Sequence, residues 1–189
     1  MYTDDLHPPP LRAPAAARTR LALLGPPRLD GPGLALELGE RTASKPVELM
    51  LRLAAAGPAG SRADALEMAL WPDIAPRARR ASLRAAIAAL ATLAGTGEPP
   101  VRESAGHVGF DPRVLEVDSI ALERALAPLL VPYADASSGE REQARRALAE
   151  ALARPASFLP GIDTPWAAAA RLRIADGIAS AARRLTAGD

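Results

Sequence analysis

Alanine and leucine dominate this chain, and their abundance constrains its fold more than any other feature. The 189 residues include 44 Ala and 27 Leu, but only 12 Val and Ile together. Ala and Leu favour helices, whereas the β-branched residues that favour strands are scarce. Because aromatic residues make up only 3%, Leu must supply most of the core volume. The composition therefore predicts a mainly α fold with a small amount of β structure.

Residues that are absent or rare argue against several classes of protein. There is no Cys, which removes disulfides and thiolate nucleophiles, and two His are too few for most zinc sites. The longest nearly apolar run, residues 85–94, is about half of a membrane span. The acidic, Pro-rich start lacks a signal-peptide pattern, and no P-loop, dinucleotide fingerprint or paired-carboxylate pattern occurs. We expect a soluble, cytoplasmic protein that is not an enzyme and uses no metal or cofactor.

The first half of the chain alternates short strands with helices. Residues 1–17 are rich in Pro and Ala and predict a disordered arm. Short apolar stretches predict strands over 21–25 and 34–38, and in the second of these the apolar residues recur at every second position. Ser44 and Pro46 open a helix that Gly57 ends, and Ser61 with Asp64 forms a capping-box variant that predicts a helix from 61 to 71. A third helix is expected from Pro76 to the C-terminal cap Gly95, followed by a hairpin over 101–110 with its turn at 104–106.

From residue 117 onward every expected element is a helix. One helix opens after Asp118, and a second follows Ser138 and runs to about residue 153. Thr164 and Pro165 are the N-cap and first residue of a last helix. Two or three helices are too few to reveal a repeat period.

Positive charge gathers in one part of the chain, although the net charge is only +1. Between residues 73 and 102 there are two acids, Asp73 and Glu98, and five cations: Arg77, Arg79, Arg80, Arg84 and Arg102. With Leu83 at the centre of the buried stripe of the third helix, a rotation of about 100° per residue defines the opposite face. That face carries Arg77, Ala81, Arg84, Ala85, Ala88 and Thr92.

The order of these elements, together with five sequence stretches, resembles a known family. The stretches are residues 21–30 (LALLGPPRLD), 69–73 (ALWPD), 78–84 (ARRASLR), 117–118 (VD) and 158–166 (FLPGIDTPW). They resemble, in the same order, the Streptomyces antibiotic regulatory protein (SARP) type of transcriptional regulator. Members of that family join an OmpR/PhoB-type winged helix-turn-helix to a helical bacterial transcriptional activation domain.

The resemblance implies a domain division. Residues 18–113 would form the winged helix-turn-helix, with N-terminal strands, a positioning helix over 61–70, a recognition helix over 76–94 and a wing over 101–110. Residues 114–189 would form a short, TPR-like helical region. Because the family's activation domain has more helices than this region can hold, we expect a shortened version that mediates dimerisation or contact with the transcription machinery.

The resemblance also implies double-stranded DNA as the partner. Arg77 or Arg84 would read guanine, which a bidentate Arg recognises with about 1–3 kcal/mol of discrimination. Arg79, Arg80 and Arg102 would contact phosphates. His107, at the wing tip, is expected to be an exposed turn residue and is a further candidate for a phosphate contact. A homodimer is expected, and RNA polymerase or another regulator is a possible partner.

Two alternatives remain open at this stage. The arginines of the third helix could form a solvated face that pairs with Asp73 and Glu67. The second half of that helix is rich in Ala, and the chain has no Asn and only one Gln, Gln143, to read adenine. A degenerate winged helix that binds another protein instead of DNA is therefore the alternative function.

Overall fold

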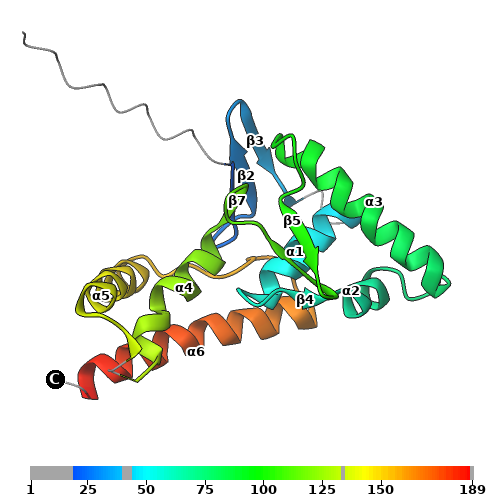
Figure 1. The fold of residues 1–189 in the computed structure, drawn as a ribbon. Coiled ribbons are helices and arrows are strands. Elements are labelled where there is room, and N and C mark those ends of the chain that lie inside the picture. The colour runs from blue at the N-terminus through cyan, green and yellow to red at the C-terminus, as the bar shows by residue number, and fades with distance from the viewer. Residues whose placement is uncertain (1–18, 40–43, 133–134, 188–189) are drawn as a thin grey trace, which may run out of the picture.

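The computed structural model describes residues 19–39, 44–132 and 135–187 (Figure 1). The predicted disordered arm, residues 1–17, lies outside the described residues. The strands are β1 (Thr19–Ala22), β2 (Arg28–Gly31), β3 (Leu34–Glu37), β4 (Ser61–Arg62), β5 (Val101–Ser104), β6 (His107–Phe110) and β7 (Leu115–Val117). The helices are α1 (Lys45–Ala56), α2 (Ala63–Leu70), α3 (Pro76–Ala94), α4 (Asp118–Leu130), α5 (Ser138–Ala153) and α6 (Pro165–Ala187).

The N-terminal strands form a four-stranded sheet with the order β3-β2-β1-β7. β1, β2 and β3 are antiparallel neighbours, whereas β7 pairs with β1 in parallel. The sequence predicted β1 and β3 but neither β2 nor β7. β2 contains a single apolar residue, Leu29, which is fully buried, and one residue cannot show a period of two. β7 has three residues and depends on a partner almost a hundred positions away.

The helices α1, α2 and α3 follow the predicted signals at most of their ends. α1 begins next to Pro46 in its first turn and ends at Gly57. α3 ends at Gly95, which has the left-handed conformation (φ 61°) and donates to the carbonyls of the last turn. These positions confirm the first and third predicted helices. A capping residue interacts only with the adjacent helical turn, so the local sequence is enough to predict it.

The predicted start of α2 is wrong. Ser61 and Arg62 form strand β4, and Arg62 occupies the N-cap position without a side-chain hydrogen bond. The backbone of Ser61 is in register with Val108 of β6, and the N–H of Ala63 donates to the carbonyl of Gly106 at 2.9 Å. Pairing with the hairpin therefore displaces the helix start by two residues.

The predicted hairpin is confirmed. β5 and β6 are antiparallel, with Ser104 opposite His107. Ala105 (φ 50°) and Gly106 (φ 76°) between them both have positive φ, which matches the twist of the flanking strands in a two-residue turn. With β4 the hairpin completes a second sheet of order β4-β6-β5.

The three helices predicted after β7 are present, although α4 and α5 begin at Asp118 and Ser138 themselves, one residue earlier than predicted. Ser137 caps α5, because its hydroxyl accepts from the N–H of Glu140 and the Glu140 carboxylate accepts from the N–H of Ser137. α4, α5 and α6 share a small core, and α6 also packs along α1. The division at residue 113 remains a prediction, although β7 beyond that point belongs to the N-terminal sheet.

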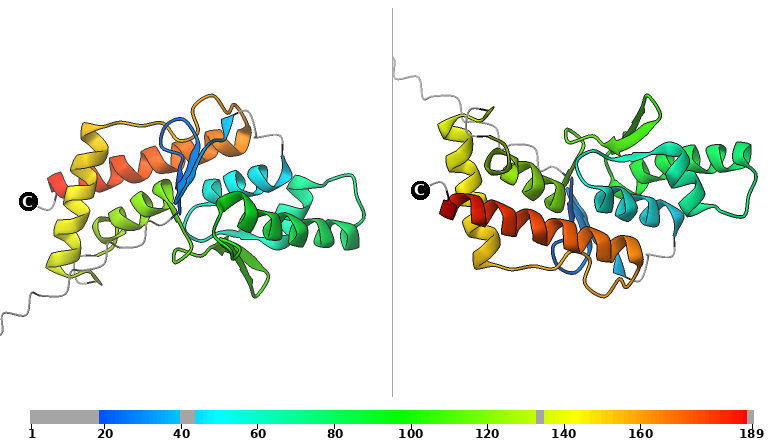
Figure 2. Two further views of the ribbon diagram at one scale, coloured as in Figure 1. Left: turned by 90° about the horizontal axis from the view of Figure 1, so that it is seen from above. Right: turned by 90° about the horizontal axis from the view of Figure 1, so that it is seen from below.

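The arrangement is consistent with a winged-helix-like fold. The larger core collects side chains from the first sheet, α1, α2, α3 and the hairpin. In Figures 1 and 2, α3 and the hairpin lie at one end of the molecule, whereas α4 and α5 lie at the other. The C-terminal helices consequently leave the outer face of α3 open.

Candidate nucleic-acid interface

The outer face of α3 consists of the residues that helical periodicity predicts. α3 packs on α1 and α2 and buries Leu83, Ala86, Leu90 and Ala94. The opposite face is exposed at every predicted position: Arg77, Ala81, Arg84, Ala85, Ala88 and Thr92. The structure therefore confirms which side of α3 faces solvent.

Arg77 and Arg84 are the two cations on this face. They are two helical turns apart, which places their Cα atoms about 10 Å from each other along the axis. Neither makes a hydrogen bond or ion pair with any residue in the described part of the chain. Both guanidinium groups therefore keep their donors available for a ligand.

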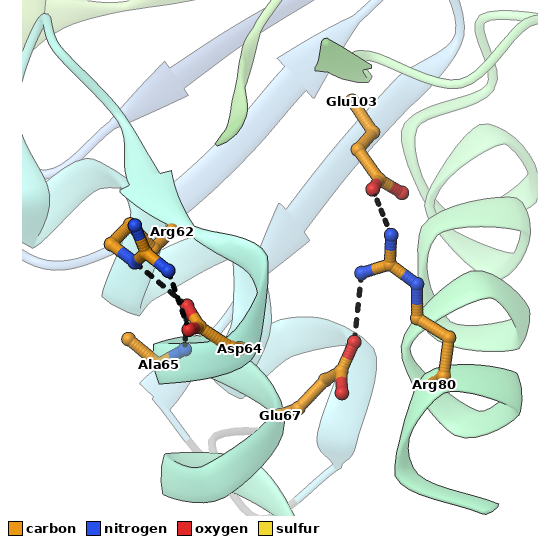
Figure 3. Close-up of polar contacts among 6 residues, drawn as sticks. All are labelled: Arg62, Asp64, Ala65, Glu67, Arg80 and Glu103. Carbon is orange, nitrogen blue, oxygen red and sulfur yellow. Dashed lines mark hydrogen bonds and ion pairs between the residues drawn. The ribbon is translucent and has the colours of Figure 1, made fainter. Parts of the chain in front are cut away.

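Arg80 is held differently, by two carboxylates. Its Nη1 donates to Oε1 of Glu67 in α2 at 2.8 Å, and its Nη2 donates to the carboxylate of Glu103 in β5 (Figure 3). The hydrogen bond with Glu67 is the main reason that the pKa of Arg80 is raised. The sequence left open that the arginines of α3 pair with acids instead of DNA, and for Arg80 the ion pair with Glu67 agrees with that alternative.

Arg79 points toward α2. Its Nη1 lies against the sulfur of Met68, and its Nε is buried without a hydrogen-bond partner. Arg79 also lines a cleft between α2 and the start of α3 together with Arg62 and Asp64. Those two residues form their own ion pair at 2.7 Å, visible in Figure 3.

The hairpin contributes one paired cation and one exposed histidine. Arg102 forms an ion pair with Asp111 through Nε, yet 59% of its side chain is exposed. Hydrogen bonds from Arg113, followed by the charge of Arg102, hold the pKa of the Asp111 carboxyl well below its usual range. His107 is exposed at the start of β6, directly after the turn.

Sequence reasoning missed two of the acids that hold these cations. Glu103 and Asp111 contact arginines that the sequence assigned to phosphate binding. Glu67 was recognised as a possible partner, but Glu103 was not, because nothing in the sequence shows that β5 packs beside α3. The site thus contains two kinds of arginine: Arg77 and Arg84 face outward, and Arg79, Arg80 and Arg102 are held by neighbours.

The described residues contain no group of three metal-binding side chains. No helix among them is both long and apolar enough to cross a membrane. The geometry of the site is thus that of an exposed helix face with a hairpin beside it.

Comparison with known proteins gives a likeness in structure only. No protein-family profile matches the chain, and no curated protein matches its sequence. The fold is similar to that of EmbR. The solved structure is Mycobacterium tuberculosis EmbR in complex with a low-affinity phosphopeptide, and it matches with a TM-score of 0.53 at 20% sequence identity. The match covers 87% of this chain and 44% of the EmbR chain.

Proposed function

We propose that this protein is a DNA-binding transcriptional regulator in which α3 and the β5–β6 hairpin contact double-stranded DNA. The observation that carries the proposal is the pair Arg77 and Arg84, unpaired within the described chain and aligned on the exposed face of α3. The similarity of the fold to EmbR, a regulator of the SARP family, supports it. So do the five sequence stretches that resemble the same family.

The residues divide into two roles. Arg77 and Arg84 are the candidates for guanine, because each has an open bidentate fork on the face that would enter the major groove. Arg79, Arg102 and His107 are the candidates for phosphates. Arg102 pairs with Asp111 through Nε, which leaves its terminal N–H groups for a phosphate. Arg80 is engaged with two carboxylates and is left out of this set.

The helices of residues 114–189 would provide the partner contacts. We propose that they mediate homodimerisation, or contact RNA polymerase or another regulator. Leu172 of α6, which is 73% exposed, is the residue at which this part of the proposal can be tested. Two half-sites bound by a dimer would compensate for the small number of base contacts in each copy.

Salt-dependent binding to a duplex tests the proposal. Fluorescence anisotropy with a labelled 20-base-pair duplex is measured at several salt concentrations for the wild type and for Arg77→Ala/Arg84→Ala. Because two bidentate contacts to guanine would be lost, we expect the double variant to bind at least about tenfold more weakly. The salt slope, which reports phosphate contacts, should change by less than about 0.9.

The matched control is Arg124→Ala/Arg145→Ala, which removes the same charge from exposed, unpaired positions of α4 and α5. Its binding should stay close to that of the wild type. Equal losses in both double variants, or no binding by the wild type at low salt, would refute the proposal.

The second half of α3 favours one alternative function. Ala85, Ala88 and Ala89 are exposed there and supply no hydrogen-bond donors. A degenerate winged helix that uses this apolar surface to bind another protein would show the same exposure. The duplex titration separates the two functions, because a protein-binding module would not distinguish Arg77→Ala/Arg84→Ala from its control.

A further inference from the structure

One guanidinium group connects the three elements of the proposed interface. Arg80, in the first half of α3, donates to Glu67 of α2 and to Glu103 of β5 (Figure 3). The side chains of Arg80, Glu67 and Glu103 are only 34%, 13% and 25% exposed. The side chain of Arg80 therefore links α3, to which it belongs, with α2 and with the wing.

The charges of this cluster oppose a phosphate contact. One guanidinium with two carboxylates carries a formal charge of −1. A DNA phosphate that approached Arg80 would meet both acids, or would have to displace one of them from a well-formed hydrogen bond. Arg77 and Arg84 on the same helix impose no such cost, because no acid within residues 19–39, 44–132 and 135–187 pairs with them.

The wing has other anchors besides this cluster. Val101 of β5 and Val108 of β6 are buried in the larger core, and β6 pairs with the two residues of β4. β5 is the other edge of that sheet, and no strand of the described residues pairs with its outer side. At the open end of the hairpin, Arg102 pairs with Asp111. Both residues belong to the segment that contains the hairpin, so this ion pair does not join the wing to α3. The ion pair of Glu103 with Arg80 joins β5 to α3.

From these contacts we propose that Arg80 is a positioning residue, which holds the wing in place relative to α3 through Glu103 and does not itself bind phosphate. The consequence for DNA binding rests on the proposed function, whereas the link between α3 and the wing does not. Arg80 would act through Arg102 and His107, because these are the hairpin side chains whose approach to DNA depends on the wing.

The first test needs no DNA. Amide hydrogen exchange is measured on Arg80→Gln, Glu103→Gln and the double variant, with Arg84→Gln as the control from the exposed face of the same helix. We expect β5 and β6 amides to exchange about two- to fivefold faster in both single variants, the size expected for a partly exposed ion pair. The double variant should add little to either one, and α1 amides should not change.

The second test distinguishes positioning from contact by the salt slope of duplex binding. Loss of a phosphate contact lowers the slope by about 0.9. In Arg80→Gln, Arg102 should still contact its phosphate in the bound state, and binding should lose only the cost of ordering a looser wing. We therefore expect binding about two- to fivefold weaker with an unchanged slope, and Arg80→Lys should recover part of the affinity. Arg102→Gln, a proposed phosphate contact, should lower the slope.

Each result decides a separate point. Unchanged hairpin exchange in both single variants overturns the positioning role, whether or not the protein binds DNA. A slope lowered by about 0.9 in Arg80→Gln overturns it as well, because Arg80 would then contact phosphate. A wild type that fails to bind any duplex refutes the proposed function, and the exchange measurement still decides the role of Arg80.

Discussion

The carboxylate of Asp118, at the start of α4, accepts hydrogen bonds from the backbone N–H of Leu23 at 2.9 and 3.0 Å. The same carboxylate accepts from the N–H of Leu24 at 3.1 Å and from that of Ser119 at 2.7 Å. Asp118 is buried, so it satisfies backbone groups at the end of β1 that water does not reach. One side chain thereby ties the N-terminal sheet to the first C-terminal helix.

Asp118→Ala should lower the free energy of unfolding by about 2–4 kcal/mol. Each buried donor that loses its partner costs about 1–3 kcal/mol, and the lost bonds are to a charged acceptor. Urea unfolding followed by circular dichroism measures the change. Asp176→Ala, in the exposed part of α6, should cost less than about 1 kcal/mol; similar costs for the two variants would contradict a special role for Asp118.

Asp111 should make stability depend on pH in the acid range. Arg113 and Arg102 hold its pKa in the folded protein below the unfolded value of about 4. The stabilisation it gives is therefore present above about pH 4 and is lost as the pH falls further. The difference in melting temperature between the wild type and Asp111→Asn should be larger at pH 7 than at pH 3.

The control for this pH effect is Asp163→Asn, which removes a carboxylate that is almost fully exposed. Its melting temperature should stay close to that of the wild type at both pH values. A difference for Asp111→Asn that is the same at pH 3 and pH 7 would show that its charge is not the cause.

Gly60 should resist substitution because of the hairpin beside it. Its φ is +69°, and a Cβ there would lie 2.3 Å from the carbonyl oxygen of Val108. Gly60→Ala should cost more than about 2 kcal/mol, since backbone strain of about 1 kcal/mol adds to a steric clash. The control is Gly97→Ala. Gly97 has a similar φ of +73°, and a Cβ there would have no atom within 4 Å, so this variant measures the backbone strain alone. Equal unfolding free energies for the two variants would exclude the clash.

A new cation on the outer face of α3 should strengthen binding to DNA. Ala88 is exposed on the same face as Arg84, so Ala88→Arg should add one phosphate contact and steepen the salt slope by about 0.9. The duplex titration measures this gain. Ala168→Arg, on an exposed position of α6, adds the same charge away from the interface. Equal gains in both would mean that net charge alone governs binding.

The exposed Leu172 should contribute to self-association. Leu172→Glu places a charge in the surface that we propose for a dimer, so the dimer should dissociate at least about tenfold more readily. Sedimentation velocity over a range of concentrations measures this change, with Ile74→Glu, at an exposed position outside residues 114–189, as the comparison. A wild type that stays monomeric throughout the range would remove homodimerisation from the proposal.

Local patterns in the sequence predicted the helices, two of their C-terminal ends and the hairpin. Gly57 and Gly95 act over one helical turn, and the turn at Ala105 and Gly106 is set by two adjacent residues. The outward face of α3 also followed from a period of 3.6, because one helix with a buried stripe has only one opposite side. These features depend on neighbours within a few positions.

Long-range packing decides which strands pair and which arginines are held by neighbouring side chains. β7 is a strand because β1 is beside it, and Ser61 is extended because Val108 pairs with it. In the same way, Arg80 differs from Arg84 only because Glu67 and Glu103 reach it from two other elements. Hydrogen bonds between distant segments and the charge around each guanidinium depend on the packing of the whole chain, which local sequence patterns do not contain.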